Sequence, residues 1–367
     1  MKVRSGKIRM LVLAPYPVGF APSQRLKYEQ YYSAFEKAGY EVTTKSFVGI
    51  RFWRVLYRKG FLLHKLWFTF LGYLRRSWHM LSIPRYDLVY VHLWVTPLGL
   101  PVFEWWTRMM SKKIVYDIDD LIFLGHASAA NKWSFHLKGR RKAIYLMKVS
   151  DHVITCTPLL DEFARKYNKH TTDISSTVDS DTYTPRSDYS FGDVPVLGWS
   201  GSHSTSRFLN MLADTLRELN MIHPFRLLVI GDAKFKMDGV DVEAITWNER
   251  TEVKDLSRID IGLYPLPDER WVLGKSGLKA HQYMALGIPV VASAKGANFR
   301  IIENETNGFL IRDIKDWKEV LLRLLKDKAL RERIGRSGRM SMVDRFSVRA
   351  NISGYLEVLD RVSGRAR

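Results

Sequence analysis

The sequence predicts an α/β protein of two domains, and three observations lead to this prediction. Short apolar stretches alternate with helix-length segments through the whole chain, a pattern typical of parallel sheets whose strands are joined by helices. The chain has 367 residues, more than one hydrophobic core usually serves. A loop rich in proline, serine and aspartate, "TYTPRSDYSFGDVP", separates two such series. We therefore place the domain boundary near residues 184–194.

The first series contains five predicted strands. "IRMLVLAPYP" is a strand that leads into a loop with Gly19. "RLKYEQYYSAFEKAGYEV" is a helix that stops at Gly39, followed by a second strand. Three more strands lie in "YDLVYVHLW", "KIVYDIDD" and "DHVITCTPLLDEF". In the last of these, Thr157 and Pro158 are a favourable N-cap and first turn for the next helix.

The second series follows the loop. "VPVLGWSGS", "FRLLVIGDA", "RIDIGLYPL" and "GIPVVAS" are predicted strands, with helices between them. The chain then closes with "DRFSVRANISGYLEVLDRV", which has the periodicity of a long amphipathic helix.

Charge and cysteine content narrow the function classes. Lys and Arg total 57 against 38 acidic residues, and the net charge of +19 favours nucleic acid, an anionic membrane or phosphorylated small molecules as partners. Cys156 is the only cysteine, which excludes an intrachain disulfide and a cysteine-based zinc site. The apolar run from Met10 to Pro15 is too short for a signal peptide. We expect a cytoplasmic protein, free or peripheral on the inner face of the cell membrane.

The segment 51–80, "RFWRVLYRKGFLLHKLWFTFLGYLRRSWHM", has an unusual composition. It carries seven Lys or Arg, nine aromatic residues and no acid. A helix would place basic residues on one face: Arg54, Arg58, Lys65 and Arg76. It would place apolar residues on the other: Trp53, Leu56, Tyr57, Leu63, Trp67, Phe70, Leu74 and Trp78. This pattern predicts binding to an anionic membrane surface. The alternative is that the apolar face packs on the domain core. Nucleic acid is not expected, because the rings have the spacing of a buried face.

The loop after the strand "VPVLGW" is a candidate phosphate site, because open parallel sheets bind ligands beyond the carboxyl ends of their strands. In "SGSHSTSRFL", Gly201 allows close backbone approach, and Ser202 belongs to a group of hydroxyl residues at a helix start. Arg207 could add a charge-assisted hydrogen bond. Taken alone, such Ser/Thr clusters are more often simple helix caps.

The segment "KSGLKAHQYMALGIPVVAS" supplies a second candidate. Lys275, Lys279 and Gln282 stand at i, i+4 and i+7 on one face of a helix that ends at Gly287. This face could bind a diphosphate, with Gln282 bonding to a hydroxyl-rich group; the alternative is an ordinary solvated face. Ser276 is a plausible N-cap. The candidate binding residues here are Lys275, Ser276, Gly277, Leu278, Lys279 and Gln282.

These segments resemble the donor site of GT-B fold glycosyltransferases, particularly the retaining family four group. "GLKAHQYMALGIPVVAS" followed by "ENETNGFLI" is similar to the signature Glu-Ala-Met-Ala-x-Gly-x-Pro-Val-Val-Ala and its Asn-Gly-Phe-Leu strand. "VLGWSGSHSTSRFL", "LLVIGDA" and "LSRIDIGLYPL" resemble other strands of the family's C-terminal domain in order. The resemblance covers residues 8–345 and is closer in the C-terminal half.

The resemblance implies a GT-B architecture, two Rossmann-like domains facing each other across a cleft. Residues 1–188 would bind the acceptor, residues 189–345 would bind the nucleotide sugar, and a helix at 346–367 would return to the first domain. The implied reaction moves a sugar from a nucleotide-diphosphate sugar to a glycan or lipid-linked acceptor, with retention and with neither metal nor cofactor. The setting would be cell-surface polysaccharide or glycolipid assembly. A nucleotide-sugar 2-epimerase of the same fold and a non-catalytic nucleotide-sugar scaffold are the alternatives.

The sequence departs from the family at two acidic positions and at the phosphate pair. The family's Glu-x7-Glu acids would fall on Gly274 and Gln282, neither of which is acidic. Gln282 could still hold the ribose through its amide. The family's Arg-and-Lys phosphate pair falls on Ser202 and Arg207, so we expect Arg207, helped by Lys275 or Lys279, to supply the phosphate charge.

In the first domain, "IVYDIDDLIF" follows a strand with three aspartates. The family often has a histidine facing the sugar here, and Asp119 aligns with it, which implies a contact to sugar or acceptor and a role as general base. An alternative is metal binding by the Asp-x-Asp pair that begins at Asp117. Asp120 could instead cap the next helix.

Two further features of the first domain are candidates. "PYPVGFAPSQR" resembles the family's glycine loop, which implies that Gly19 and Arg25 contact donor phosphate or acceptor. Arg25 could equally be an ordinary surface arginine. His92 lies inside an apolar strand, where a buried, hydrogen-bonded histidine is the expected outcome.

Overall fold

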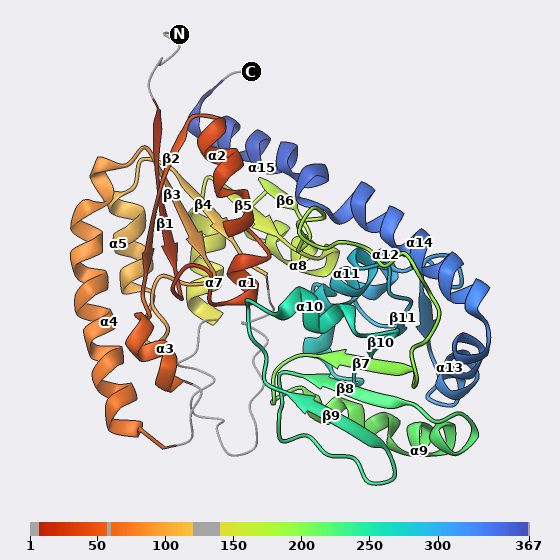
Figure 1. Cartoon of the computed structure of the whole chain (residues 1–367). Helices are drawn as coiled ribbons and strands as arrows, with labels where there is room; N and C mark the ends of the chain where they lie inside the picture. Colours follow the sequence, from red (N-terminus) through yellow and green to blue (C-terminus); the bar gives the residue numbers. More distant parts are fainter. Residues whose placement is uncertain (1–6, 57–59, 120–139, 366–367) are drawn as a thin grey trace. The chain divides into compact units, whose positions relative to one another are not determined.

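The computed structural model describes residues 7–56, 60–119 and 140–365. Contacts divide the chain into two compact units, the first formed by Met1–Ser176 and Asn351–Arg367 and the second by Thr177–Ala350. Each unit contains one six-stranded sheet, and every pair of neighbouring strands is parallel (Figure 1). The predicted α/β class with two Rossmann-like sheets is therefore confirmed.

The first unit has the strand order β2-β1-β3-β4-β5-β6. Its elements are β1 (Ile8–Ala14), α1 (Pro22–Arg25), η1 (Glu29–Tyr31), α2 (Tyr32–Lys37), β2 (Tyr40–Ser46), α3 (Ile50–Leu56), α4 (Leu62–Ser82), η2 (Ile83–Arg85), β3 (Leu88–His92), α5 (Val102–Met110), β4 (Ile114–Asp117), α7 (Arg140–Val149), β5 (His152–Thr155), α8 (Pro158–Arg165) and β6 (Thr171–Asp173).

Helices cover both faces of this sheet. On one face, Met80 of α4 and Leu146 of α7 join the buried strand residues in one hydrophobic cluster, and Figure 1 shows α4 and α5 side by side along it. On the other face, Tyr31 and Phe35 pack against Tyr355 of the last helix, α15 (Val348–Ser363). Burial on both faces explains why these strands form continuous apolar runs in the sequence.

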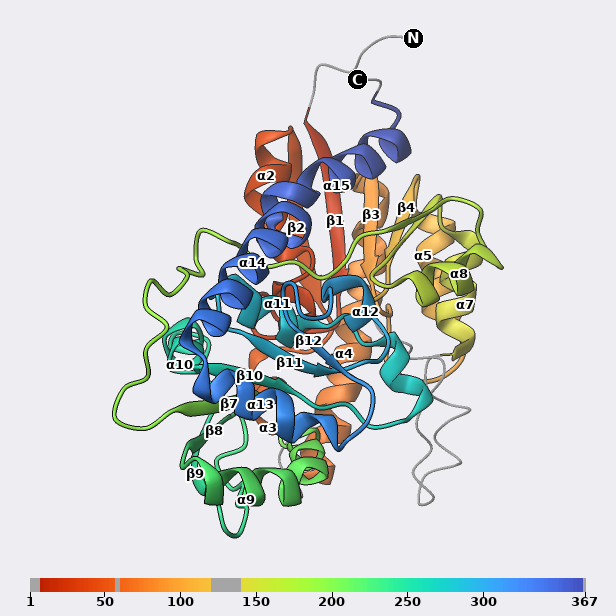
Figure 2. The ribbon, with the colours of Figure 1, turned by 90° about the vertical axis from the view of Figure 1, so that its right-hand side faces the viewer.

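The second unit has the strand order β12-β11-β10-β7-β8-β9, which can be followed in Figure 2. Its elements are β7 (Val196–Ser200), η4 (Ser206–Leu212), α9 (Ala213–Ile222), β8 (Arg226–Ile230), β9 (Asp241–Ile245), α10 (Glu252–Ser257), β10 (Ile261–Tyr264), η5 (Arg270–Gly274), α11 (Leu278–Ala285), β11 (Val290–Ser293), α12 (Asn298–Ile301), β12 (Phe309–Ile311), α13 (Asp316–Lys326) and α14 (Lys328–Phe346).

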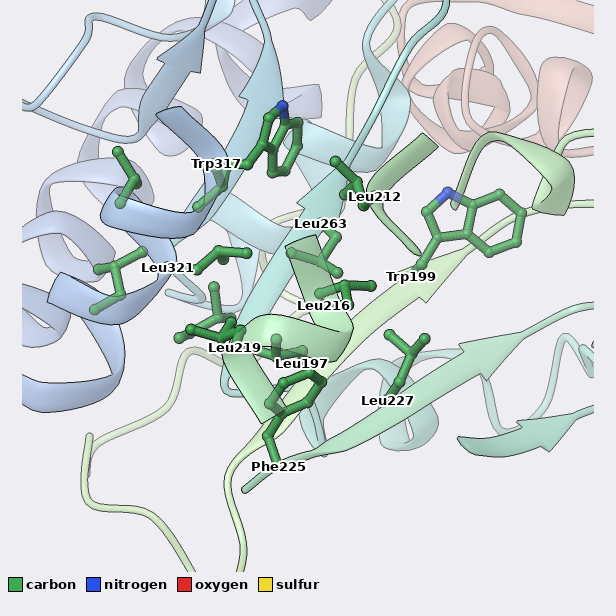
Figure 3. Packing of buried hydrophobic residues seen from close by; sticks show 14 of the residues in the cluster. Leu197, Trp199, Leu212, Leu216, Leu219, Phe225, Leu227, Leu263, Trp317 and Leu321 are labelled. Carbon is green, nitrogen blue, oxygen red and sulfur yellow. The ribbon is translucent and has the colours of Figure 1, made fainter. Parts of the chain in front are cut away.

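A dense apolar core lies between this sheet and helices α9 and α13. Leu197 and Leu263 from the strands meet Leu216 of α9 and Trp317 of α13, as Figure 3 shows. The opposite face of the sheet packs on α10, α11 and α14. There Gly198 leaves room for Ile259, because a Cβ at that position would clash with the isoleucine side chain. The sheet is therefore buried on both faces, which holds the loops at its carboxyl edge on rigid strands.

Most predicted strands are confirmed, and the two that were missed lie at sheet edges. β6 pairs only with β5 and β9 pairs only with β8. Edge strands are half solvated, so "TTD" and "DVEAI" lack the apolar run that marks a central strand. The helix expected after Gly19 is broken into α1, η1 and α2, although it does stop at Gly39, whose φ is 90°. Thr157 caps α8 as predicted.

The division between the units falls between Ser176 and Thr177, before the predicted boundary at 188/189. Residues after Thr177 pack on the second unit: Val178 and Tyr183 join its core, and the Arg186 guanidinium lies 2.7 Å from the Asp260 carboxylate. The proline- and serine-rich stretch is thus attached along its length to the second unit. The predicted final helix is two helices, since α14 ends before Ser347, and residues from Asn351 onward belong to the first unit.

The segment 51–80 forms parts of α3 and α4 rather than one helix, with Gly60 (φ 78°) between them. Arg58 lies outside the described residues. The prediction that Arg76 lies on an exposed basic face is wrong: it is fully buried and donates to the carbonyls of Lys45 and Ala14. The predicted apolar stripe of α4 does not pack on the core. Its members are each more than half exposed: Leu63, Trp67, Phe70, Leu74 and Trp78.

No helix among the described residues is both long enough and apolar enough to cross a bilayer.

Candidate active site

Two glycines at the carboxyl ends of β7 and β8 form the floor of the candidate donor site. Gly231 has a φ of 108°, and a Cβ there would collide with the carbonyl oxygen of Gly201. A Cβ on Gly201 would lie 3.0 Å from Cε of Lys279 and 2.5 Å from the Trp199 ring. The glycines thus let two backbone segments and the Lys279 side chain come together, whereas the contact of Gly201 with a phosphate stays a prediction.

Lys279 lies in an aromatic setting at this floor. Its Nζ is 5.1 Å from the ring centroids of both Trp199 and Tyr264. Burial, with a smaller contribution from Lys275, lowers the pKa of Lys279 to about 7. Within the described part of the chain no carboxylate lies within ion-pair distance of its ammonium group. An anionic ligand would therefore meet a cation whose charge no described carboxylate neutralises.

The start of α11 differs from the prediction. The N-cap is Gly277, with a φ of 77°, and not Ser276, so no side chain caps the helix. Gly277 is required there because a Cβ would clash with the Ile301 side chain. The helix begins at Leu278 and its C-cap is Leu286, followed by Gly287 at φ 68°. The predicted stop is therefore confirmed, whereas Ser276 lies before the cap.

Lys275 precedes the helix in extended conformation, so it does not share a helical face with Lys279 and Gln282. Its Nζ lies 5.1 Å from the Trp271 ring, and Trp271 in turn packs against Phe208 at 5.9 Å between centroids. The exposed Arg207 lies over Phe208. The structure thus brings Lys275 and Arg207 to the two sides of one aromatic pair.

The hydroxyl loop after β7 is closed by its own hydrogen bonds. The hydroxyls of Ser202 and Ser204 are 2.8 Å apart, and Thr205 donates to the Ser202 carbonyl. The Ser206 hydroxyl donates to Asp232, in the loop after β8. The element that follows, η4, is a 3₁₀ helix and not the α-helix expected there. The phosphate-binding role of Ser202 stays a prediction.

Gln282 lies in a buried polar network that the sequence did not reveal. Its amide nitrogen donates to the Tyr183 hydroxyl (2.9 Å) and to Glu252 Oε1 (3.2 Å). Glu252 is itself buried and also accepts from the indole nitrogen of Trp247. A carboxylate is thus present beside Gln282, supplied by α10. Gly274, the other position where the family has an acid, is buried at the end of η5.

In the first unit, a buried ion pair lies at the ends of β4 and β5. Lys27 Nζ is 3.4 Å from Asp117 Oδ1, with both side chains fully buried, and it donates to the carbonyls of Thr155 and Ile174. The Tyr90 hydroxyl also donates to Asp117. Burial alone would raise the pKa of Asp117, but Lys27 and its other neighbours lower it. Asp117 is thus held as a carboxylate by protein groups, which disfavours the metal alternative for the Asp-x-Asp pair.

His92 lies between the two aspartates of that motif. Its Nδ1 is 3.7 Å from Asp117 Oδ2, and its Nε2 is 3.9 Å from Asp119 Oδ1. His92 is buried as predicted, and each of its ring nitrogens faces one of the two carboxylates at these distances. The Asp119 side chain keeps 10% of its surface exposed. Asp120, the predicted cap, lies outside the described residues.

The loop that contains Gly19 is closed by Glu29 and Gln24. The Gly19 N–H, expected to meet a ligand, donates to Glu29 Oε2 at 2.8 Å. Gln24 donates to Glu29 Oε1 and accepts from the Tyr16 N–H. Burial raises the pKa of Glu29, and Arg25 is among the groups that lower it, so Arg25 lies near this carboxyl group. Its role as a ligand contact stays a prediction.

Comparison with known proteins identifies the second unit. Residues 194–327 match the family "Glycosyl transferases group 1". The matched stretch is 134 of the chain's 367 residues, so the family match applies to this part of the chain. The match covers β7 to α13, the elements that hold Gly201 and Lys279. The resemblance seen in the sequence is confirmed for this region, and it assigns the domain to a family of transferases.

Solved structures agree with a GT-B glycosyltransferase fold across the chain. Sucrose-phosphate synthase from Thermosynechococcus elongatus is 15% identical, with a TM-score of 0.69 and coverage of 98% of this chain and 100% of that one. HepE of Anabaena, in complex with UDP and glucose, is 17% identical, with a TM-score of 0.66 and coverage of 96% and 100%. At these identities the likeness shows the fold.

A curated relative matches only a part of the chain. Trehalose synthase of Pyrococcus horikoshii is 32% identical over 89 residues, which are 24% of this chain and 21% of that protein. The chain therefore spans about a fifth of that relative's length.

Sequence reasoning missed three residues that the glycosyltransferase fold brings into the candidate sites. Lys27 and Glu252 look like ordinary helical polar residues in the sequence, and Trp247 lies in an unassigned loop. No local pattern separates a buried lysine in "RLKYEQ" from a solvated one. In the case of Glu252, the missing family acid at position 282 was the available signal, because it pointed to a carboxylate supplied from elsewhere.

Proposed function

We propose that the protein transfers a sugar from a nucleotide-diphosphate sugar to a glycan or lipid-linked acceptor. In this proposal the second unit holds the donor diphosphate at the Gly201 floor. Lys279 supplies the nearest charge, with Lys275 and Arg207 beside it. One observation supports this most strongly. The Lys279 side chain lies against Gly201, which itself contacts Gly231, and no described carboxylate is within ion-pair distance of its ammonium group.

The chemistry follows from charge on the leaving group. As the glycosidic bond of the donor breaks, negative charge develops on the diphosphate. Lys279, held between Trp199 and Tyr264, would stabilise that charge without having to leave a carboxylate partner among the described residues. No metal is required in this proposal. Retention of the anomeric configuration rests on the family resemblance alone.

Asp119 is the proposed contact to the reacting sugar or the acceptor hydroxyl. Its carboxylate is partly exposed at the end of β4, while Nε2 of the buried His92 lies 3.9 Å behind it. A carboxylate in this position could accept the proton of an acceptor hydroxyl. His92 would then position Asp119 rather than contact substrate, because it is fully buried.

We propose that α4 places the enzyme on an anionic membrane in the cytoplasm, where cell-surface glycans or glycolipids are assembled. Support comes from the exposed stripe Leu63, Trp67, Phe70, Leu74 and Trp78, and from the absence of acidic residues between Glu41 and Asp87 in the sequence. Flotation with acidic liposomes tests it. The triple change Trp67→Ser, Phe70→Ser and Trp78→Ser should abolish flotation, whereas the same changes at the exposed Met221, Ile222 and Met340 of the second unit should leave it intact.

The proposed reaction is tested by titration with a panel of UDP-, GDP- and dTDP-sugars, followed by product analysis with the sugar that binds. Wild type should bind one donor class and transfer its sugar. Asp119→Asn should bind the donor equally but lower turnover by about 100-fold or more. Donor binding without transfer by wild type would favour the non-catalytic scaffold, and epimerised free donor would favour the 2-epimerase. Equal turnover by Asp119→Asn would contradict the role of Asp119.

A further inference from the structure

The first unit contains a pocket that the proposed donor and acceptor groups do not use. It has a volume of about 670 Å³ and lies after the carboxyl ends of β1 and β2, between α3 and α4. Its walls are mostly apolar side chains from three segments: Val18, Ile50, Phe52, Phe68 and Leu71. Pockets of this size and composition are typical of sites for small molecules with a hydrocarbon part.

Two arginines also line this pocket. Arg51 is exposed on α3, and Arg75 projects from α4, where its Nη2 donates to the Phe47 carbonyl at 2.6 Å. The Arg75 Nε is buried and makes no hydrogen bond to a described residue. Among the residues that the structure describes, neither guanidinium has a carboxylate within ion-pair distance, and burial lowers the pKa of Arg75. The pocket therefore combines apolar walls with positive charge that these residues do not neutralise.

The position of Arg75 is also fixed by its surroundings. A Cβ at Gly49 would lie 3.0 Å from Arg75 Nη1, so the glycine leaves room for the guanidinium beside the pocket. A Cβ at Gly72 would lie 2.7 Å from the Phe47 ring, so α4 packs closely on Phe47 at this point, one turn before Arg75. A guanidinium held in this way loses little side-chain freedom when it binds an anion.

The same helix exposes the apolar stripe. Phe68, Leu71 and Arg75 line the pocket, while Trp67, Phe70 and Leu74, each one residue earlier, belong to the stripe. Successive residues of an α-helix are about 100° apart around its axis, so the two faces are adjacent. A ligand that suits both faces has a hydrocarbon chain and an anionic head.

We propose that this pocket binds the head of a phosphate-bearing membrane lipid, with its phosphate on Arg51 and Arg75 and the first part of its chain against Phe52, Phe68 and Leu71. Planar guanidinium groups pair with phosphate oxygens in two-point hydrogen bonds, which supplies the head-group recognition. If the proposed glycosyl transfer holds, this lipid is the carrier of the acceptor. The binding itself does not depend on that reaction.

Binding is tested with dihexanoyl phosphatidic acid below its micelle concentration, measured by calorimetry on the full chain. Wild type should bind it at least tenfold more tightly than it binds inorganic phosphate or uncharged dihexanoylglycerol. Arg51→Gln should weaken binding about tenfold, because a charged hydrogen-bonding group is lost. Arg54→Gln is the matched control, since Arg54 is exposed on the same helix but does not line the pocket. It should change affinity by less than twofold.

A second change tests the apolar wall. Ile50→Trp should fill part of the pocket and weaken phosphatidic acid binding, yet leave inorganic phosphate binding unaltered; far-ultraviolet circular dichroism checks that each variant is folded. Equal weakening by Arg51→Gln and Arg54→Gln, or equal affinity for inorganic phosphate, would overturn the proposal. Lys279→Met should leave phosphatidic acid binding intact. Phosphatidic acid binding and nucleotide-sugar binding are therefore measured independently, so that the lipid proposal can be refuted without refuting the donor-site proposal, and the reverse.

Discussion

Two lysines, the buried Lys27 of the first unit and the half-buried Lys279 of the second, show two different uses of the same chemical group. Lys27 is enclosed in the first unit with the Asp117 carboxylate and two backbone carbonyls. Lys279 lies in the second unit between two aromatic rings, and no described carboxylate is within ion-pair distance. Burial lowers the pKa of Lys279 to about 7, and Lys275 adds to that effect.

The presence of a carboxylate partner distinguishes a lysine that stabilises the fold from a lysine that can bind an anionic ligand. A buried charge is costly unless it is paired, so a lysine with full pairing stabilises the fold around it. A half-buried lysine without such pairing is retained at a cost in stability, which points to function. Substitution should therefore affect the two lysines in opposite ways, and the largest effect is expected at Lys27.

Lys27→Met should lower the free energy of unfolding by about 3–5 kcal/mol, because it leaves the Asp117 carboxylate buried without its partner. Chemical denaturation and hydrogen exchange of the β3–β5 amides measure the loss. Lys37→Met is the control, since Lys37 is exposed on α2 in the same unit. Adding Asp117→Asn to Lys27→Met should restore part of the stability. A loss below about 1 kcal/mol would show that Lys27 is not a structural cation.

Lys279→Met should have the opposite profile. Nucleotide-sugar affinity should fall about 10–100-fold, since a charged hydrogen bond contributes roughly 1.5–3 kcal/mol. The free energy of unfolding should stay level or rise, because a poorly solvated cation has been removed. Calorimetric titration and denaturation of the same sample give both numbers. If this variant unfolded as readily as Lys27→Met while still binding donor, the functional interpretation of Lys279 would fail.

The pH dependence sharpens the comparison further. With a pKa near 7 in the free protein, Lys279 is largely neutral above that value, and the diphosphate must draw a proton onto it. Donor affinity should therefore decrease by up to about tenfold as pH rises from 7 to 8. Calorimetry in buffers of different ionisation enthalpy should show proton uptake, which Lys279→Met removes. Proton uptake that persists in the variant would mean that another group titrates.

The same depressed pKa has a consequence for stability. The unfolded chain binds a proton at Lys279 up to the ordinary lysine pKa, whereas the folded protein releases it near pH 7. The contribution of this residue to the unfolding free energy therefore rises with pH between about 7 and 10.5. Lys279→Met should flatten the stability profile in that window.

Arg207→Gln should have the smallest effect. Arg207 is exposed over the Phe208 ring, so water and salt screen its attraction for a diphosphate. We expect donor affinity to fall only about two- to fivefold, which corresponds to less than about 1 kcal/mol. Titrations at low and high salt measure it, and the difference from wild type should vanish at high salt. If Arg207→Gln lowered donor affinity more than Lys279→Met does, Arg207 and not Lys279 would be the main cation for the diphosphate.

The two sites also differ in how much of each was predictable from sequence. The Gly201 loop was found because it directly follows an apolar strand, and the end of α11 because Gly287 and Pro289 stop the helix just before the next strand, so both signals are local. The pairing of Lys27 with Asp117 and that of Gln282 with Glu252 were not found. The two members of these pairs are 90 and 30 positions apart in the sequence and meet only in the folded protein. The N-cap at Gly277 was missed for a steric reason: Ile301, a residue of another helix, leaves no room for a side chain.

The segment 51–80 shows the same limit. Periodicity placed Leu63, Trp67, Phe70, Leu74 and Trp78 of α4 on one apolar face, but it left out Leu62, Leu66 and Leu81, which are exposed on the same helix. It could not reveal that Arg76 turns inward to bind the backbone carbonyls of Lys45 and Ala14. A single buried arginine in a basic segment looks like its solvated neighbours, so experiments on this segment should leave Arg76 unchanged.

Because α15 belongs to the first unit, that unit is completed during synthesis only after the second unit has been made. Residues 7–176 of the first unit are made before the second unit, but they lack Tyr355 against Tyr31 and Asp360 against Tyr40 until those later residues have been made. Both ends of this unit meet at one place, since Ile8 bonds to the Gly39 carbonyl and Arg365 bonds to the Ala38 carbonyl. A gene in which residues 351–365 are joined by a short linker to residue 7 would therefore encode the first unit as one continuous piece.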